Sequence, residues 1–196
     1  MNIVCARHSD EIPATKSVDI LVLPEDIPSS EILLASKRYR SAIVVAAVRD
    51  GRYMRGYLML DGKNQIDYLK TLADGRSAPY IGSQDLPVYE GKAMAIGVLV
   101  CRDYESNDLR LPMLERLHCA SASASVICIP ADMHGDFFQG DQIAVFPGVF
   151  CALSNHKKTY ENPYRCRSFI ANRVGAIVSR QIGYEPISAS AAKPLA

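Results

Sequence analysis

Three residues that could carry out acyl transfer follow apolar segments of this 196-residue chain. Glu25 comes directly after Leu21-Val22-Leu23-Pro24, Lys70 closes the segment QIDYLK, and Cys101 ends the segment IGVLVC. A carboxylate can take the proton of a thiol, and the resulting thiolate can attack an electrophilic carbon. An ammonium group nearby can stabilise the charge that develops on oxygen or nitrogen. Together the three residues predict a cysteine-dependent acyl-transfer site.

Each of these residues also has a non-catalytic interpretation. A glutamate after a strand is usually solvated or caps a helix, a lysine at a strand end is usually on the surface, and a cysteine in an apolar strand is usually a packed thiol. Glu25 and Lys70 are 45 positions apart (70 − 25), and Lys70 and Cys101 are 31 apart (101 − 70). The catalytic interpretation therefore depends on elements that bring the three residues together.

Short apolar segments rich in β-branched residues predict strands throughout the chain. They are centred near residues 3, 21, 44, 58, 97, 127, 150 and 176, and each is bounded by Gly, Pro, Asp or Ser. Segments of this length and composition favour strands over helices. Several are apolar throughout, which is typical of a sheet covered on both faces. The carboxyl ends of such strands are where side chains converge on a ligand.

Two helices and one hairpin are predicted between these strands. Ser29 or Ser30 is expected to cap a helix over 31–40, with Ile32, Leu33 and Tyr39 on its buried side. Asn107 or Asp108 is expected to cap a second helix over 109–122, with Pro112 in its first turn and a buried face of Leu109, Met113, Leu114 and Leu117. Between Tyr57 and Leu72 the pattern predicts a hairpin that turns at Gly62-Lys63-Asn64. Alternating strands and helices indicate a layered α/β domain.

Three segments resemble the nitrilase, or carbon–nitrogen hydrolase, superfamily. GKAMAIGVLVCRDYESNDLR is similar to the family's nucleophile segment, in which a strand ends in the catalytic cysteine and an acidic residue and a helix with an arginine follow. DILVLPE resembles the strand that ends in Pro-Glu, and GYLMLDGKNQIDYLKTL resembles the hairpin that ends in tyrosine, any residue, lysine. The resemblance runs in colinear order over residues 1–180. It places Glu25, Lys70 and Cys101 at the family's catalytic positions.

The resemblance implies a fold and an assembly. The expected fold is an α/β, nitrilase-like α-β-β-α sandwich, with its four layers either within a subunit or formed on dimerisation. Residues 1–184 are expected to form a single domain, and the tail 185–196 either to be disordered or to cross to a partner subunit. The expected state is a homodimer or a higher homo-oligomer.

The resemblance also implies a reaction at a C–N bond of a small molecule. The cysteine would attack an amide or nitrile carbon to form a thioester or thioimidate, and the backbone N–H of Arg102 would be an oxyanion donor beside Lys70. The family's second glutamate is not found after the lysine, where Asp74 is the nearest acid. His134 and Phe137, in a loop expected near the pocket mouth, are further candidates for substrate contact, although packing under the loop or exposure to solvent is the alternative for each.

The departures from the family pattern leave other functions open. Residues 8–19 contain Pro13 and are too few for the full helix that usually follows the first strand. The trimmed first half and the missing glutamate favour a catalytically impaired subunit with a binding or assembly role as the alternative. A third possibility is a Cys–His hydrolase on another α/β fold, using Cys101 with His134 or His156.

Composition excludes several other classes of function. Twenty-two basic and twenty-one acidic side chains give a net charge of +1, so no overall field attracts nucleic acid or a membrane surface. The six cysteines have irregular spacing and form no CxxC pair, which favours free thiols in a reducing compartment and gives no reason to invoke a metal or another cofactor. The N-terminus has no signal-peptide pattern, and no apolar segment is long enough to span a bilayer. These features predict a cytoplasmic protein.

Overall fold

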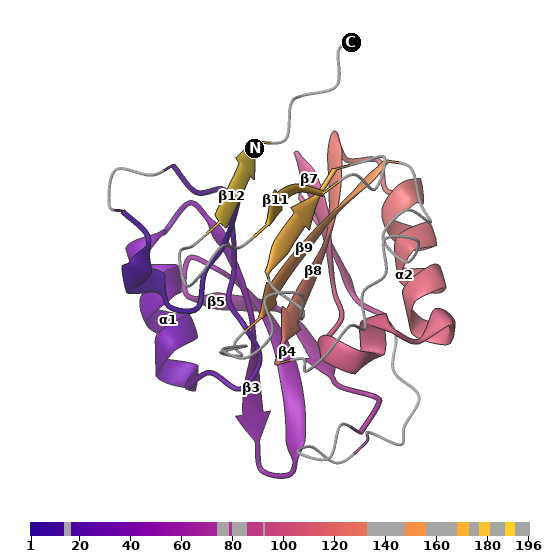
Figure 1. Cartoon of the computed structure of the whole chain (residues 1–196), viewed down its shortest axis with the longest axis horizontal. Helices are drawn as coiled ribbons and strands as arrows, with labels where there is room; N and C mark the ends of the chain where they lie inside the picture. The colour runs from indigo at the N-terminus through magenta and orange to yellow at the C-terminus, as the bar shows by residue number, and fades with distance from the viewer. Residues whose placement is uncertain are drawn as a thin grey trace.

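Two six-stranded sheets face each other in the computed structural model, and each has one helix on its outer side (Figure 1). The structure describes residues 1–13, 17–73, 79, 86–91, 93–132, 148–155, 168–172, 177–180 and 187–190. Helix α1 (Ser29–Arg38) lies outside the first sheet and α2 (Asn107–Cys119) outside the second. The predicted α-β-β-α sandwich is confirmed, and its four layers are formed within a single chain.

The first sheet brings two of the predicted strand ends to the same edge. Its order is β12 (Ile187–Ser190), β1 (Asn2–Cys5), β2 (Ile20–Val22), β3 (Ile43–Asp50), β4 (Tyr53–Leu60) and β5 (Lys63–Leu69). Strands β1, β2 and β3 are parallel, and β4 is antiparallel to both β3 and β5. Strand β5 therefore runs in the same direction as β2, so the residues after β2 and after β5 lie at one edge of the sheet.

The second sheet supplies the nucleophile segment. Its order is β11 (Ile177–Arg180), β10 (Phe169–Ala171), β9 (Val149–Asn155), β8 (Ala124–Ala131), β7 (Met94–Val98) and β6 (Val88–Glu90). Strands β7, β8 and β9 are parallel, and the outer strands pair antiparallel with them. A short 3-10 helix, η2 (Cys101–Tyr104), connects β7 toward α2.

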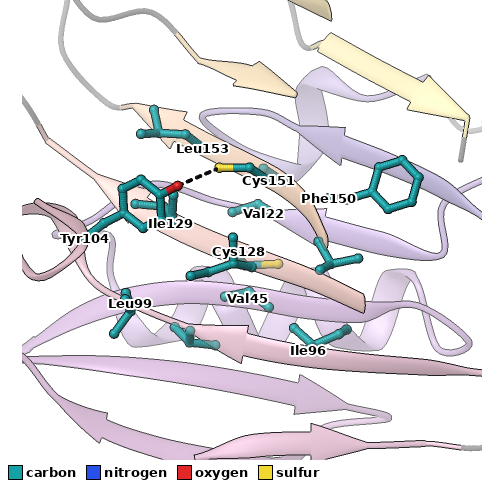
Figure 2. Close-up of a cluster of buried hydrophobic side chains, with 14 of the residues drawn as sticks. Val22, Val45, Ile96, Leu99, Tyr104, Cys128, Ile129, Phe150, Cys151 and Leu153 are labelled. Carbon is teal, nitrogen blue, oxygen red and sulfur yellow. Dashed lines mark hydrogen bonds between the residues drawn. The ribbon is translucent and has the colours of Figure 1, made fainter. Parts of the chain in front are cut away.

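Residues buried on both faces of the first sheet explain the absence of polar alternation in β1, β2 and most of β3. Ile3 and Cys5 of β1 face the second sheet, whereas Val4 between them packs on the side of α1. The layer between the sheets contains Val22 and Val45 of the first sheet among residues of the second (Figure 2). Successive side chains of a strand point to opposite faces of the sheet. Because both faces are covered here, every residue must be apolar, and the sequence shows continuous apolar segments.

Both predicted helices are present, but their caps and one buried residue differ from the prediction. Helix α1 begins at Ser29, so its N-cap is Pro28 and not a serine, and Leu33 is exposed because Ile32, Ala35 and Ser36 form the buried face. Helix α2 has Ser106 as its N-cap, one residue earlier than expected. Pro112 therefore lies at the sixth helical residue and not in the first turn.

The hairpin turns one residue earlier than predicted. Leu60 pairs with Lys63, so Asp61 and Gly62 form a two-residue turn, and both have positive φ (49° and 72°). Two such residues in succession give a turn whose twist matches that of the flanking strands, and an Asp-Gly pair favours it. Between β1 and β2 the structure shows a 3-10 helix over Ser9–Glu11, in accord with the expected lack of room for a full helix there.

Part of the predicted tail belongs to the fold. Residues Ile187–Ser190 form β12, which pairs antiparallel with β1 at the edge of the first sheet. These residues thus complete a sheet of their own chain, and the rest of the tail lies outside the described residues. Cys5, Cys101, Cys128 and Cys151 are buried free thiols, and Cys119 is an exposed one. In the part of the chain that the structure describes, no helix has the length and apolarity needed to cross a membrane.

Gly56 in β4 permits close contact between the two sheets just before the nucleophile. A Cβ at this position would lie 2.9 Å from Cγ2 of Val100 and 3.2 Å from Cγ1 of Val98. Both valines are fully buried and have stiff side chains. We expect Gly56→Ala to lower the free energy of unfolding by about 1–3 kcal/mol, because overpacking must displace one sheet from the other. Urea denaturation followed by circular dichroism measures this loss.

The matched control for this prediction removes the obstructing methyl groups. Val100→Ala alone leaves a cavity and is also destabilising, but combined with Gly56→Ala it makes room for the added methyl. The double variant should therefore lose less stability than the sum of the two single variants. Additive losses would contradict the close contact between Gly56 and Val100.

Candidate active site

Glu25 and Lys70 form a buried ion pair between the sheets. The Lys70 ammonium donates to Oε1 of Glu25 at 2.7 Å, and the exposed fractions of the two residues are 0% for lysine and 2% for glutamate. Two charges removed from water in this way must compensate each other, because either one alone would be strongly unfavourable. The pair therefore fixes the relative position of the residues that follow β2 and β5.

The backbone on either side holds this pair in place. The Glu25 N–H donates to the Ala131 carbonyl of the second sheet at 3.3 Å, and the Lys70 N–H donates to the Met54 carbonyl of β4 at 2.8 Å. After Glu25 the chain turns at Asp26, whose φ is 62°, and its carboxylate accepts two hydrogen bonds from Arg49 of β3 at 3.0 and 2.9 Å. Both members of the ion pair are thus anchored by main-chain hydrogen bonds.

Cys101 joins the pair from the second sheet. It is the first residue of η2, is 2% exposed and has a φ of 51°, in the left-handed region that residues other than glycine rarely adopt. The Glu25 carboxylate and the Asp132 backbone both lie close enough to its thiol to shift the pKa of that thiol. A non-glycine residue held in this conformation marks a site where the surrounding structure fixes the backbone.

Burial raises the pKa of the Cys101 thiol above its usual range, and the negative charge of Glu25 raises that pKa further. The Lys70 charge and the Asp132 N–H lower it, but they do not outweigh the first two causes. The resting site therefore contains a protonated thiol beside a carboxylate, with an ammonium in contact with that carboxylate. This set can form a nucleophile by moving the proton from sulfur to the carboxylate.

Tyr104 anchors the nucleophile turn in the core between the second sheet and α2. Its ring is 1% exposed and lies beside Ile129 and Cys151, and the Cys151 thiol donates to its hydroxyl oxygen at 3.8 Å (Figure 2). The Arg110 guanidinium lies 5.5 Å from the centre of the Tyr104 ring and donates to the Tyr104 carbonyl. These contacts fix the end of η2 opposite to Cys101.

Arg102 is placed toward solvent and not against the thiol. Its side chain is about half exposed, donates to the Ala73 carbonyl at 3.3 Å and lies 3.7 Å from the Glu105 carboxylate. The guanidinium is not among the groups that shift the pKa of the neighbouring thiol. The backbone N–H of Arg102, directly after the nucleophile, remains the candidate oxyanion donor.

The remaining sequence candidates lie outside the residues that the structure describes. Asp74, His134, Phe137 and His156 all fall in this group, so their predicted contacts stay predictions. Among the described residues, no group of three or more His, Cys, Asp or Glu side chains could hold a metal ion.

Two side chains near the site were not singled out from the sequence. Asp103 is fully buried, and its carboxylate accepts hydrogen bonds from the Tyr68 hydroxyl and from the backbone after Lys70. The signal was present, since an acid follows the cysteine by two positions and a tyrosine precedes the lysine by two.

Solved structures of other proteins share this fold. The chain is similar to an amidase from Nesterenkonia sp., with 19% identity, a TM-score of 0.68 and coverage of 96% of this chain and 88% of that one. It is also similar to Saccharomyces cerevisiae Nit3, a member of branch 10 of the nitrilase superfamily, with 14% identity, a TM-score of 0.70 and coverage of 96% and 89%. The chain therefore has the nitrilase-superfamily fold.

A third similar structure is a variant of the amidase from Nesterenkonia sp. AN1 in which acrylamide has undergone Michael addition at the active site cysteine. It has 17% identity and a TM-score of 0.64, with coverage of 96% of this chain and 91% of that one. No family model matches the sequence, and no curated protein matches it.

The charges around the thiol predict opposite effects of two substitutions. Because the Glu25 charge raises the pKa of Cys101, Glu25→Gln should lower that pKa and leave the Lys70 charge to stabilise the thiolate. Lys70→Met removes the cation and should raise the pKa of Cys101. The midpoint of the iodoacetamide reaction rate against pH, measured at Cys101 by peptide mass spectrometry, reports the pKa of the thiol.

Exposed Cys119 serves as the internal reference in this measurement, because the same reagent modifies it in the same sample. Its profile should be the same in all three proteins. Shifts of the Cys101 midpoint in the same direction for both variants would contradict the charge arrangement described here.

Proposed function

We propose that the chain is a cysteine hydrolase that cleaves a non-peptide C–N bond, in an amide or nitrile, of a small molecule. The observation that supports this proposal is the buried ion pair of Glu25 and Lys70, whose charges both act on the Cys101 thiol, at the edge where two sheets of nitrilase-superfamily fold meet. A base, a cation and a nucleophile in contact and away from bulk water are what acyl transfer requires.

In this mechanism Glu25 takes the proton of Cys101 as the sulfur attacks the amide carbon. The tetrahedral intermediate carries its negative charge on oxygen, which the Lys70 ammonium and the Arg102 backbone N–H stabilise. Glu25 then returns the proton to the leaving nitrogen, and ammonia or an amine departs from a thioester. With a nitrile, the same attack gives a thioimidate.

Water completes the reaction. Glu25 removes a proton from a water molecule, whose oxygen attacks the thioester carbon, and the C–S bond breaks to release a carboxylic acid. The proton returns to sulfur, so the site ends as it began. The same carboxylate acts as base, acid and base again, which requires it to stay within reach of sulfur, nitrogen and water in turn.

The second candidate is a catalytically impaired subunit with a binding or assembly role. The burial of the site favours it, since the three groups are between 0% and 2% exposed and the thiol is protonated at rest. Such a cluster would act only to hold the two sheets together. We further propose a homodimer or higher homo-oligomer in the cytoplasm, as the family resemblance implies, and sedimentation velocity measures the oligomeric state.

A combined adduct and turnover experiment separates the two functions. An active enzyme should release ammonia from small primary amides such as butyramide, and acrylamide should alkylate Cys101 ahead of the other thiols. We expect Cys101→Ala to abolish both while it leaves the melting temperature within a few degrees. Glu25→Gln should lower kcat by about 10²- to 10⁴-fold, as loss of a general base does.

Cys119→Ala is the matched control, because this thiol is exposed and lies at the end of α2. It should leave ammonia release and the Cys101 adduct unchanged. No ammonia release from any amide or nitrile, with alkylation that does not favour Cys101, would favour the impaired subunit. Loss of folding in Cys101→Ala would mean that the thiol serves packing.

A further inference from the structure

Asp103 is a fully buried carboxylate that accepts three hydrogen bonds. The donors belong to Tyr68, Thr71 and Leu72. Its Oδ2 accepts from the Tyr68 hydroxyl at 2.5 Å and from the Thr71 N–H at 2.7 Å, and its Oδ1 accepts from the Leu72 N–H at 2.7 Å. A buried carboxylate is retained only where donors replace its hydration, and here both oxygens are bonded.

These donors flank the catalytic lysine on both sides. Tyr68 is two residues before Lys70, and Thr71 and Leu72 follow it directly. The acceptor lies two residues after Cys101 in η2. One carboxylate thus joins segments that are 31 to 35 positions apart in sequence and belong to different sheets. The lysine cannot move along the strand direction without stretching at least one of these bonds.

Few other contacts could perform this task in the described part of the chain. Arg102 donates to the Ala73 carbonyl, but its side chain is about half exposed and the bond is 3.3 Å long. Tyr104, the next residue after Asp103, fixes η2 to the core of the second sheet, whereas Asp103 fixes it to the lysine of the first sheet. The two neighbours thus hold the same turn from two directions.

We propose that Asp103 is a positioning residue that sets the place of the Lys70 ammonium relative to the Cys101 sulfur. This inference rests on the proposed function, in which that spacing decides how well the lysine stabilises the attacking sulfur and the oxyanion. Asp103 acts through the backbone around Lys70 and takes no part in bond making. A displacement of about 1 Å between reacting groups can cost about 100-fold in rate.

The test compares Asp103→Asn with Tyr68→Phe. Asparagine keeps the size of the side chain but faces one of the N–H donors with another N–H, so the segment after Lys70 must shift. Tyr68→Phe keeps the carboxylate charge and removes one donor only. Asp67→Asn is the matched control, because Asp67 lies next to Tyr68 on β5 but forms an exposed ion pair with Arg55.

The first readout is the pH midpoint of Cys101 alkylation, which does not depend on turnover. If Asp103 holds the lysine in place, Asp103→Asn moves the cation away and the thiol pKa rises, with a smaller rise for Tyr68→Phe and none for Asp67→Asn. Loss of a negative charge with the lysine unmoved would instead lower the thiol pKa. A fall or no change in Asp103→Asn overturns the proposal.

The second readout is a double-variant cycle with Lys70→Met. A residue that acts through the lysine has nothing left to position when the ammonium is gone, so Asp103→Asn should not shift the thiol midpoint further in the Lys70→Met background. Equal shifts in both backgrounds overturn the proposal. Should Asp103→Asn fail to fold, the same cycle with Tyr68→Phe decides the question.

The third readout is kinetic and separates this proposal from the proposed function. On the best amide substrate of the unmodified protein, Asp103→Asn should lower kcat by about 10- to 100-fold with less than about a threefold change in KM. Melting temperatures measured alongside identify variants that lose activity by unfolding. If no variant or parent hydrolyses an amide, the proposed function fails, while the alkylation midpoints still decide whether Asp103 positions Lys70.

Discussion

The buried ion pair between Glu25 and Lys70 is the constraint on which the arrangement of the site depends. An ammonium and a carboxylate in contact at 2.7 Å, with almost no exposed surface, cannot separate without leaving two charges in an apolar interior. The strand order brings them to one edge of the first sheet, because β5 runs in the direction of β2 after two antiparallel reversals. The ion pair then closes the remaining gap, and the second sheet must pack so that Cys101 meets it.

Local backbone geometry places each reactive group at the end of its strand. Asp26, directly after the base, and Cys101 itself both have positive φ, so the chain reverses sharply at the two places where a side chain must face the other sheet. Such conformations need external support, since they are unfavourable for residues with a Cβ. Arg49 supports the first turn through Asp26, and Asp103 and Tyr104 support the second. The reactive residues are therefore held by neighbours that perform no chemistry.

The sequence predicted the strands and the three residues of the site better than the contacts between them. Apolar segments bounded by Gly, Pro or Asp locate most of the strands because residue composition reflects burial on both faces. Strand β12, at the edge of the first sheet, escaped notice, since four residues are too few to show a period. The helix caps were misplaced by a residue or two because several Ser, Asn and Asp side chains compete at each end. Asp103 and Tyr68 are visible in the sequence as an acid after the cysteine and a tyrosine before the lysine. Their role was missed because it arises from a contact between segments more than thirty positions apart.

The charge state of the site has a consequence for how the proposed reaction could begin. At rest the cluster holds a carboxylate, an ammonium and a neutral thiol, whose charges sum to zero. When the thiol proton moves to Glu25, the cluster holds a carboxylic acid, an ammonium and a thiolate, and the sum is again zero. In a medium of low dielectric, a step that leaves net charge unchanged avoids the large penalty of creating an unpaired ion. The ammonium then stabilises the thiolate as it stabilised the carboxylate before, provided that Lys70 lies within reach of both. A site this deeply buried can hold a protonated thiol and still form its nucleophile, and the position of Lys70 decides how readily it does so.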